Sequence, residues 1–217
     1  MMEFKNAEEK INFLAQYLPA IKEVKDQKTA AAVVDVWLKA LEMSPWDSID
    51  QAKFKEGMDR ITLISHVNSA VECALAINRI IKKYHDVECD EQRLLVFGLL
   101  HDVDKVVEYE YNENGELVKS DLAKKIQHGV LSAMWAREAG FDMDMIHLII
   151  THTHDQNMKP AFREGILFGY ADLCDWEMTC KYSKQRRKHK WKVMRNCIFM
   201  VECWERGFQW SHLLLLW

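Results

Sequence analysis

The sequence is poor in the residues that make tight turns. Only 8 glycines and 3 prolines occur among its 217 residues, and folds built from strands and short turns need many more of them. Apolar residues make up 49% and charged residues 29% of the chain, which is ordinary for a globular protein able to bury a core. The shortage of turn residues therefore favours an all-α fold.

The chain also lacks any CxxC pair, although it has six cysteines within helix-like stretches: Cys73, Cys89, Cys174, Cys180, Cys197 and Cys203. This distribution is typical of reduced thiols, so we expect a cytoplasmic protein. The N-terminal segment MMEFKNAEEK is charged from its third residue, and no run approaches the roughly 18 apolar residues of a membrane span. We expect neither a signal peptide nor a membrane partner.

An excess of positive charge is missing as well. The net charge of -4 argues against non-specific binding of nucleic acid by the whole surface. One basic run, KYSKQRRKHKWK at 181–192, could hold phosphates, or bind nucleic acid with Trp191 as a stacking partner. A solvated helix face explains the run more simply. We therefore do not expect nucleic acid as a partner.

Apolar residues recur at helical spacing along most of the chain. The pattern predicts helices over 4–23, 28–43, 60–84, 90–101, 121–138, 142–153, 162–181 and 188–206. Because Leu94 to Leu100 is nearly all apolar, the fourth of these helices should be central and buried. The segment 109–119 alternates around Asn114-Gly115 and predicts a short hairpin or loop.

We expect a single domain with a helical core over 60–181. Residues 1–58 would form an N-terminal helical extension, and residues 182–217 a C-terminal one. The C-terminal extension is apolar and aromatic, which is compatible with a homodimer.

The most informative residues are His101 and Asp102, adjacent in the stretch LLVFGLLHDVDK. They place an imidazole and a carboxylate at the end of the same helix. More imidazoles and a carboxylate recur at intervals of roughly one helix-turn-helix, at His66, His128, His152 and Asp172. Helical bundles gather the ligands of a metal in this way.

The order His, His-Asp, His, His, Asp resembles the HD-domain superfamily of metal-dependent phosphohydrolases over about 66–172, roughly half of the chain. The resemblance implies a compact helical bundle in which His66, His101, Asp102 and Asp172 ligate a metal. His128 and His152 allow a second ion, with Asp102 as the bridge. Nitrogen and oxygen ligands suit a divalent transition metal, either Fe, Mn, Co, Ni or Zn.

Several neighbouring residues leave alternatives open. His152 and His154 are two apart and do not share a helix face, so we favour His152 as the ligand and His154 as a substrate-facing residue. Lys105 stands where many HD proteins have HD-x-x-K, and could bind a substrate phosphate or simply end a helix in solvent. Asp104 replaces a glycine common in the family. Like Asp175, it could orient a ligand.

The resemblance implies a phosphohydrolase that acts on a nucleotide or other small phosphate ester through a metal-activated water. Asp102 and Lys105 would be its catalytic residues. Some HD-fold proteins with the same ligand set hold two irons and cleave their substrates with dioxygen, so a di-iron oxygenase is the alternative; Lys105 favours phosphate. A non-catalytic helical binding protein is the third hypothesis, and it requires the six ligand residues to be coincidental or vestigial.

Overall fold

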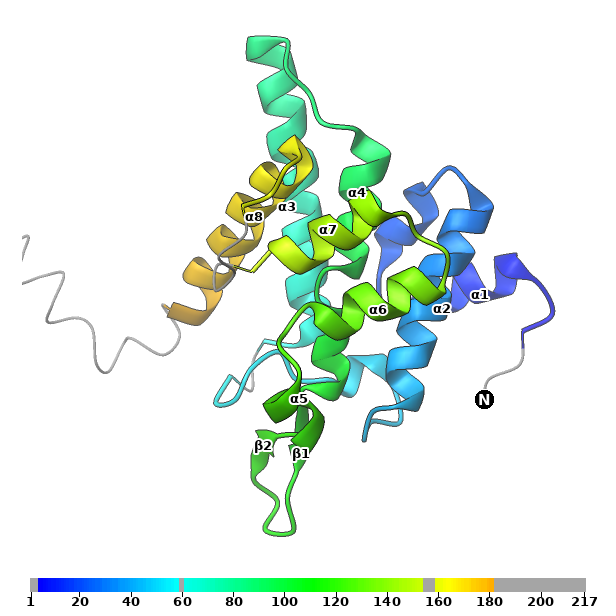
Figure 1. Ribbon diagram of the computed structural model, residues 1–217, viewed down its shortest axis with the longest axis vertical. Coiled ribbons are helices and arrows are strands. Elements are labelled where there is room, and N and C mark those ends of the chain that lie inside the picture. The colour runs from blue at the N-terminus through cyan, green and yellow to red at the C-terminus, as the bar shows by residue number, and fades with distance from the viewer. Residues whose placement is uncertain (1–3, 59–60, 154–158, 182–217) are drawn as a thin grey trace, which may run out of the picture.

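Helices dominate the described part of the chain, which comprises residues 4–58, 61–153 and 159–181 of a computed structural model (Figure 1). The α-helices are α1 (Ala7–Leu14), α2 (Gln27–Glu42), α3 (Leu63–His85), α4 (Glu91–Leu100), α5 (Asp121–Lys125), α6 (Val130–Glu138), α7 (Met143–Thr151) and α8 (Arg163–Trp176). Short 3-10 segments cover Pro19–Glu23, Ile49–Gln51 and Val103–Val107, and a π-helical turn covers Glu177–Lys181. The fold is all-α, as the sequence predicts.

α4 lies at the centre of the fold. The Asp90 side chain caps its first turn by accepting from the backbone N–H groups of Gln92 and Arg93. Every residue from Leu94 to Leu100 is buried, because α3, α7 and α8 pack around the helix. This confirms the central, buried helix that ends at His101.

The buried side chains form one continuous cluster that includes residues of the N-terminal helices. Trp37, Phe97 and Phe168 are its largest fully buried members. Trp37, on α2, donates from Nε1 to the backbone oxygen of Leu99 on α4 at 2.9 Å, which satisfies its polar atom inside the core. Residues of the N-terminal segment thus share their core with the helices that carry His101 and Asp102. The division at 58 and 181 stays a prediction.

The helix expected over 4–23 is interrupted. α1 ends at Leu14, and a 3-10 segment begins at Pro19. Proline cannot donate a backbone hydrogen bond and keeps the preceding residue out of the helical region; accordingly Leu18 has φ -124° and ψ 80°. Leu18 and Ile21 are nevertheless fully buried.

The single helix expected over 121–138 is wrong. The chain forms α5 and α6 with a turn between them, in which Gly129 adopts φ 86°. This left-handed conformation is accessible to glycine at little cost. The Gly129 N–H donates to the Asp104 carboxylate at 2.5 Å, and His128 consequently lies in the turn before α6 instead of on a helix.

The hairpin is confirmed. β1 (Tyr109–Tyr111) and β2 (Leu117–Lys119) pair antiparallel, with Tyr109 opposite Lys119, and they lie at one end of the molecule in Figure 1. Cys73, Cys89 and Cys174 are free thiols. No helix within the described ranges is long and apolar enough to cross a membrane. The helix expected over 188–206 and all but the first residue of the basic run lie outside the described residues.

Candidate metal centre

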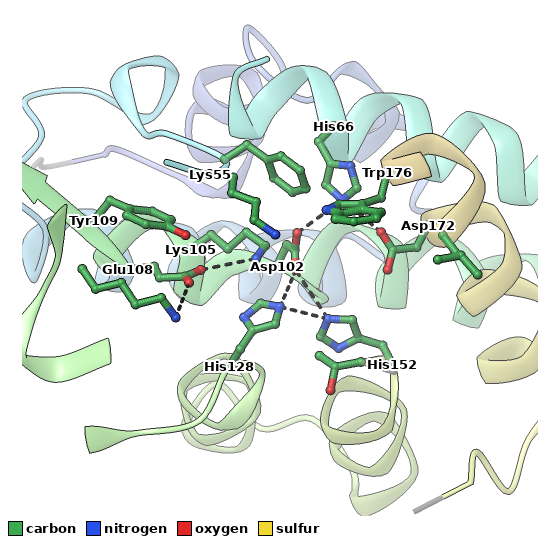
Figure 2. A pocket seen from close by; sticks show the side chains of 14 residues that line it. Lys55, His66, Asp102, Lys105, Glu108, Tyr109, His128, His152, Asp172 and Trp176 are labelled. Atoms are coloured by element: carbon green, nitrogen blue, oxygen red, sulfur yellow. Dashed lines mark hydrogen bonds and ion pairs between the residues drawn. The ribbon is translucent and has the colours of Figure 1, made fainter. Parts of the chain in front are cut away.

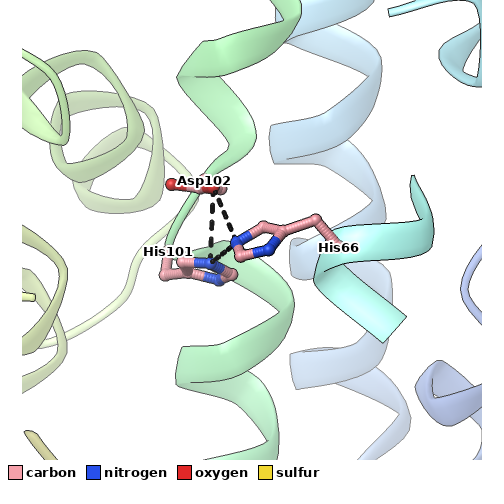
Figure 3. Close-up of side chains that lie close together, drawn as sticks. All are labelled: His66, His101 and Asp102. Atoms are coloured by element: carbon pink, nitrogen blue, oxygen red, sulfur yellow. Dashed lines mark hydrogen bonds and ion pairs between the residues drawn. The ribbon is translucent and has the colours of Figure 1, made fainter. Parts of the chain in front are cut away.

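His66, His101 and Asp102 converge from two helices (Figure 3). His66 belongs to the first turn of α3, and His101 caps the C-terminus of α4. The Asp102 Oδ2 atom lies 3.3 Å from His66 Nε2 and 3.5 Å from His101 Nε2, and the two Nε2 atoms lie 3.4 Å apart. From α8, Asp172 Oδ1 approaches His66 Nε2 to 3.1 Å. His66, His101 and Asp102 form a first group of possible metal donors, and Asp172 lies next to it.

His128 and His152 face the other oxygen of the same carboxylate (Figure 2). The Asp102 Oδ1 atom lies 2.9 Å from His128 Nε2 and 3.4 Å from His152 Nε2. The two imidazole Nε2 atoms are 3.3 Å apart. His152 caps the C-terminus of α7. Asp102 therefore offers one oxygen to each of two histidine groups.

Each of the four imidazoles has an oxygen atom close to Nδ1: His66, His101 and His152 are hydrogen-bonded through this atom, and His128 Nδ1 lies beside the Asp104 carboxylate. The pairs are His66 with Asp175 Oδ2 at 2.7 Å, His101 with the Gly98 carbonyl at 2.7 Å, His128 with Asp104 Oδ1 at 2.9 Å, and His152 with the Ile149 carbonyl at 2.6 Å. A proton on Nδ1 that donates to such an acceptor leaves the Nε2 lone pair free to bind a metal. All four Nε2 atoms point toward the carboxylates of the centre.

The electrostatics keep two of these donors, His101 and Asp102, free of a competing proton. Burial lowers the pKa of His101 to about 4, so its imidazole is neutral at pH 7. Burial would raise the pKa of Asp102, but Lys105, His101 and His128 outweigh that effect and hold this pKa well below its usual range. Asp102 is therefore an ionised carboxylate although it is only 3% exposed.

The donor set fits divalent metal ions. Each group offers at least three nitrogen or oxygen atoms within coordinating reach of one another, and such donors suit first-row transition metals. The structure brings together the six residues expected from the sequence, although their role as ligands stays a prediction. His154 lies outside the described residues.

Asp104 and Asp175 are buried. Asp104 lies against His128 and Asp175 against His66, so each carboxylate is placed to orient an imidazole, as the sequence suggested.

A cleft of about 470 Å³ opens beside the histidines and carboxylates (Figure 2). Sequence reasoning missed several of its lining residues: Phe54, Lys55, Glu108, Tyr109, Lys119 and Trp176. Phe54, for example, stacks on the His66 ring with centroids 4.1 Å apart. It lies in an irregular segment without periodicity, so no signal could have found it. Tyr109 and Lys119 could have been found, because they are equally distant from Asn114, and a hairpin centred there pairs them.

Lys105 reaches the same cleft. Its Nζ atom lies 3.3 Å from Glu108 Oε2. Burial would lower the pKa of Lys105, but the carboxylates of Asp102, Glu108 and Asp104 raise it above its usual value. Lys105 is thus a permanently charged cation next to the histidine–aspartate cluster, and not a solvated helix end.

The fold and this cluster define a helical protein with a centre suited to divalent metal ions. Residues 63–178, just over half of the chain, match the profile of the HD domain family. The chain belongs to the HD domain family, as its histidine–aspartate order suggested.

Among curated proteins, the dihydroneopterin 2',3'-cyclic phosphate phosphodiesterase of Methanocaldococcus jannaschii is 25% identical over 114 residues. The aligned region covers 52% of this chain and 45% of that relative, so the chain matches less than half of the relative's length. No solved structure gives a significant match.

Proposed function

We propose that the protein is a phosphohydrolase whose centre holds two divalent ions bridged by Asp102. The observation that carries this proposal is the division of one carboxylate between two histidine groups, at distances of 2.9–3.5 Å. A carboxylate shared in this way could bridge two ions about 3.5–4 Å apart. The likeness to a phosphodiesterase of the same family supports the same class of reaction.

Six residues would hold the ions. His66, His101, Asp102 and Asp172 would bind one ion, and Asp102, His128 and His152 the other. When bound, such ions lower the pKa of a water molecule to give a nucleophile near neutral pH and neutralise charge on a phosphoryl group. The protein's own contribution is to present the imidazoles in a fixed orientation, through Asp175 and Asp104.

Lys105 is the side chain we assign to the phosphate. Its ammonium group stays charged beside Asp102 and lines the cleft. A lysine in this position can donate to a phosphate oxygen and stabilise the negative charge that develops during attack on phosphorus. Asp102 and Lys105 are therefore the proposed catalytic residues.

The proposed substrate is a nucleotide or another small phosphate ester. A cleft of about 470 Å³ lies within the range that binds small molecules. Phe54, Tyr109 and Trp176 give it aromatic walls. His154 stays a predicted substrate contact, and a homodimer and a cytoplasmic location stay predictions.

Metal content and hydrolysis test the proposal together. Protein purified without chelators and loaded with Mn²⁺ should carry about two ions per chain and hydrolyse a general phosphodiester such as bis(p-nitrophenyl) phosphate. Asp102→Asn should lose both ions, and its activity should fall by more than the roughly 10–100-fold that follows loss of an orienting partner. Asp121→Asn, at a carboxylate that is 81% exposed, is the matched control and should behave as the wild type.

Two outcomes would overturn the proposal. Failure to bind Mn²⁺, Fe²⁺ or Zn²⁺ would favour a non-catalytic binding protein. Two tightly bound irons with dioxygen consumption and no ester hydrolysis would establish the oxygenase alternative.

A further inference from the structure

Glu108 is a buried carboxylate that the proposed metal centre does not use. It directly follows the 3-10 segment Val103–Val107 and is 9% exposed. Its Oε2 atom accepts from Lys105 Nζ at 3.3 Å, and its Oε1 atom lies 3.2 Å from Lys119 Nζ. One carboxylate therefore holds two lysines, one from the segment after Asp102 and one from the hairpin.

The hairpin brings Lys119 to the cleft by its register. Lys119 pairs with Tyr109, the residue after Glu108, and the next residue, Ser120, donates its backbone N–H to the Glu108 carbonyl at 2.9 Å. The Ser120 hydroxyl also donates to the Val107 carbonyl at 2.7 Å. These contacts make the base of the hairpin a fixed part of the cleft wall.

Three lysines and three carboxylates line the cleft, but the carboxylates face different partners. Lys55, Lys105 and Lys119 line it, and Figure 2 shows Lys55 and Lys105 directed toward the space beside Asp102. The lining carboxylates Asp102 and Asp172 face the histidines. Glu108 contacts two of the three lysines, Lys105 and Lys119, so one negative charge lies between two ammonium groups, and this arrangement favours an anion beside them.

The ion pair of Lys119 can exchange partners at low cost. The Lys119 side chain is 52% exposed, whereas that of Glu108 is 12% exposed. A pair that is open to water on the lysine side contributes less than about 1 kcal/mol. A phosphate oxygen that enters the cleft can therefore recruit this ammonium group while Glu108 still holds Lys105.

We propose that Lys119, held by Glu108 beside Lys105, forms a second anion subsite, and that the substrate carries at least two phosphate groups. One phosphate would lie at the histidine–aspartate centre, an assignment that rests on the proposed function, and the other at Lys119. Lys119 is then a substrate-binding residue that selects for the second phosphate. Glu108 is a positioning residue that acts through the two lysines.

Binding of inorganic pyrophosphate and inorganic phosphate tests the subsite without a known substrate. Calorimetric titrations of both anions into Mn²⁺-loaded protein should show an affinity for pyrophosphate about 10-fold lower in Lys119→Ala than in the wild type, the loss expected for one charged hydrogen bond. Lys119→Arg should restore most of it. Phosphate should bind both variants within about 2-fold of the wild type, because it occupies the first subsite alone. Chelation of Mn²⁺ by pyrophosphate affects every variant alike.

Lys124→Ala is the matched control. Lys124 lies in α5, shortly after the hairpin, and its side chain is 57% exposed and paired with Asp121. Its replacement should change the affinity for neither pyrophosphate nor phosphate. Glu108→Gln distinguishes the positioning of Lys105 and Lys119 by Glu108 from the effect of its negative charge on anion binding. Removal of a negative charge alone would tighten binding of an anion, whereas loss of positioning should weaken pyrophosphate binding.

The outcomes separate this inference from the proposed function. If Lys119→Ala lost affinity for pyrophosphate and phosphate equally, or for neither, the subsite would be rejected even if the protein hydrolyses phosphate esters. Tighter pyrophosphate binding in Glu108→Gln would reject the positioning role. If Lys119→Ala lost affinity for pyrophosphate alone and the wild type hydrolysed no ester, the subsite would be retained and the proposed function rejected.

Discussion

His66 Nδ1 lies 2.7 Å from Asp175 Oδ2, so a carboxylate of α8 fixes the orientation of an imidazole of α3. The Ser69 hydroxyl donates to the other oxygen of Asp175. Both oxygens of Asp175 therefore have partners, and the carboxylate cannot turn away from His66 without breaking a contact. The geometry of the first donor group depends on this pair, although Asp175 is not itself a predicted ligand.

Asp175→Asn should weaken metal binding at the first group by about 10–100-fold, because an uncharged amide holds the Nδ1 proton less firmly. Titration with Mn²⁺ would measure the change. Asp144→Asn, at a carboxylate with a 49% exposed side chain, should bind metal as the wild type does. Equal affinities in the two variants would show that Asp175 does not act through His66.

Gly129→Ala should impair metal binding as well as stability. Gly129 has φ 86°, and an added Cβ atom would lie 3.2 Å from the Ile149 carbonyl oxygen and 3.4 Å from His152 Cε1. A side chain in this conformation costs about 1–2 kcal/mol. The crowding acts on the imidazole of His152 and on the turn that carries His128, so we expect fewer than two ions per chain by elemental analysis.

Gly140→Ala provides the matched control for Gly129→Ala. Gly140 has φ 95°, but a Cβ atom there would meet nothing within 4 Å. The free energy of unfolding should fall by a similar amount in Gly140→Ala as in Gly129→Ala, but Gly140→Ala should retain its metal. Loss of metal in both variants would mean that destabilisation alone, and not crowding of His152, explains the effect.

The six predicted ligands could be chosen from the sequence because ligand chemistry depends on residue type and order. A His-Asp pair at the end of an apolar helix is a local signal, and the resemblance to the HD-domain superfamily indicated the remaining ligands. The place of His128 could not be derived in the same way. It depends on the turn at Gly129, where the backbone is left-handed and the N–H donates to the carboxylate of Asp104, 25 residues away.

The cleft was less predictable than the histidine–aspartate cluster. Lys55 and Phe54 belong to a segment without periodicity, and only tertiary contacts bring them to His66 and Trp176. Glu108 is a single glutamate outside any motif, so the sequence does not indicate that it lines the cleft. Its importance follows from burial and from two lysines that approach it from different elements, and neither property is visible in the sequence.

Gly98→Ala should destabilise the protein by about 1–3 kcal/mol, the usual cost of overpacking a core. An added Cβ atom would lie 2.7 Å from Phe168 and 2.8 Å from Val71, because α3 and α8 approach α4 closely at this point. The Gly98 carbonyl accepts from His101 Nδ1, so metal affinity should fall with stability. Urea unfolding and Mn²⁺ titration would measure both.

Gly169→Ala, in contrast, should be neutral or stabilising by about 0.5–1 kcal/mol, the helix preference for alanine over glycine. Gly169 lies within α8, and a Cβ atom there meets nothing within 4 Å. A larger loss of stability in Gly169→Ala than in Gly98→Ala would contradict the packing of these three helices.

Metal binding should become stronger as the pH rises from about 6.5 to 9. Burial and Lys105 lower the pKa of His128, but the carboxylates of Asp104 and Asp102 outweigh them and raise it from 6.5 to about 9. Between these values the folded, metal-free protein retains a proton that the unfolded chain releases. The stabilisation from this proton is fully present below pH 6.5 and is lost as the pH rises through about 9.

A metal ion at His128 Nε2 must displace that proton, so protons and metal compete for the same atom. The Tm of chelator-treated protein should therefore fall between pH 6.5 and 9, and the gain in Tm on adding Mn²⁺ should widen over the same interval. Asp104→Asn removes one of the carboxylates that raise the pKa of His128. The pKa of His128 should therefore be lower in this variant, and the fall in Tm should be complete at a lower pH than in the wild type. A metal-induced gain in Tm that stays constant or shrinks as the pH rises would mean that His128 is not protonated in the metal-free protein, or is not a ligand.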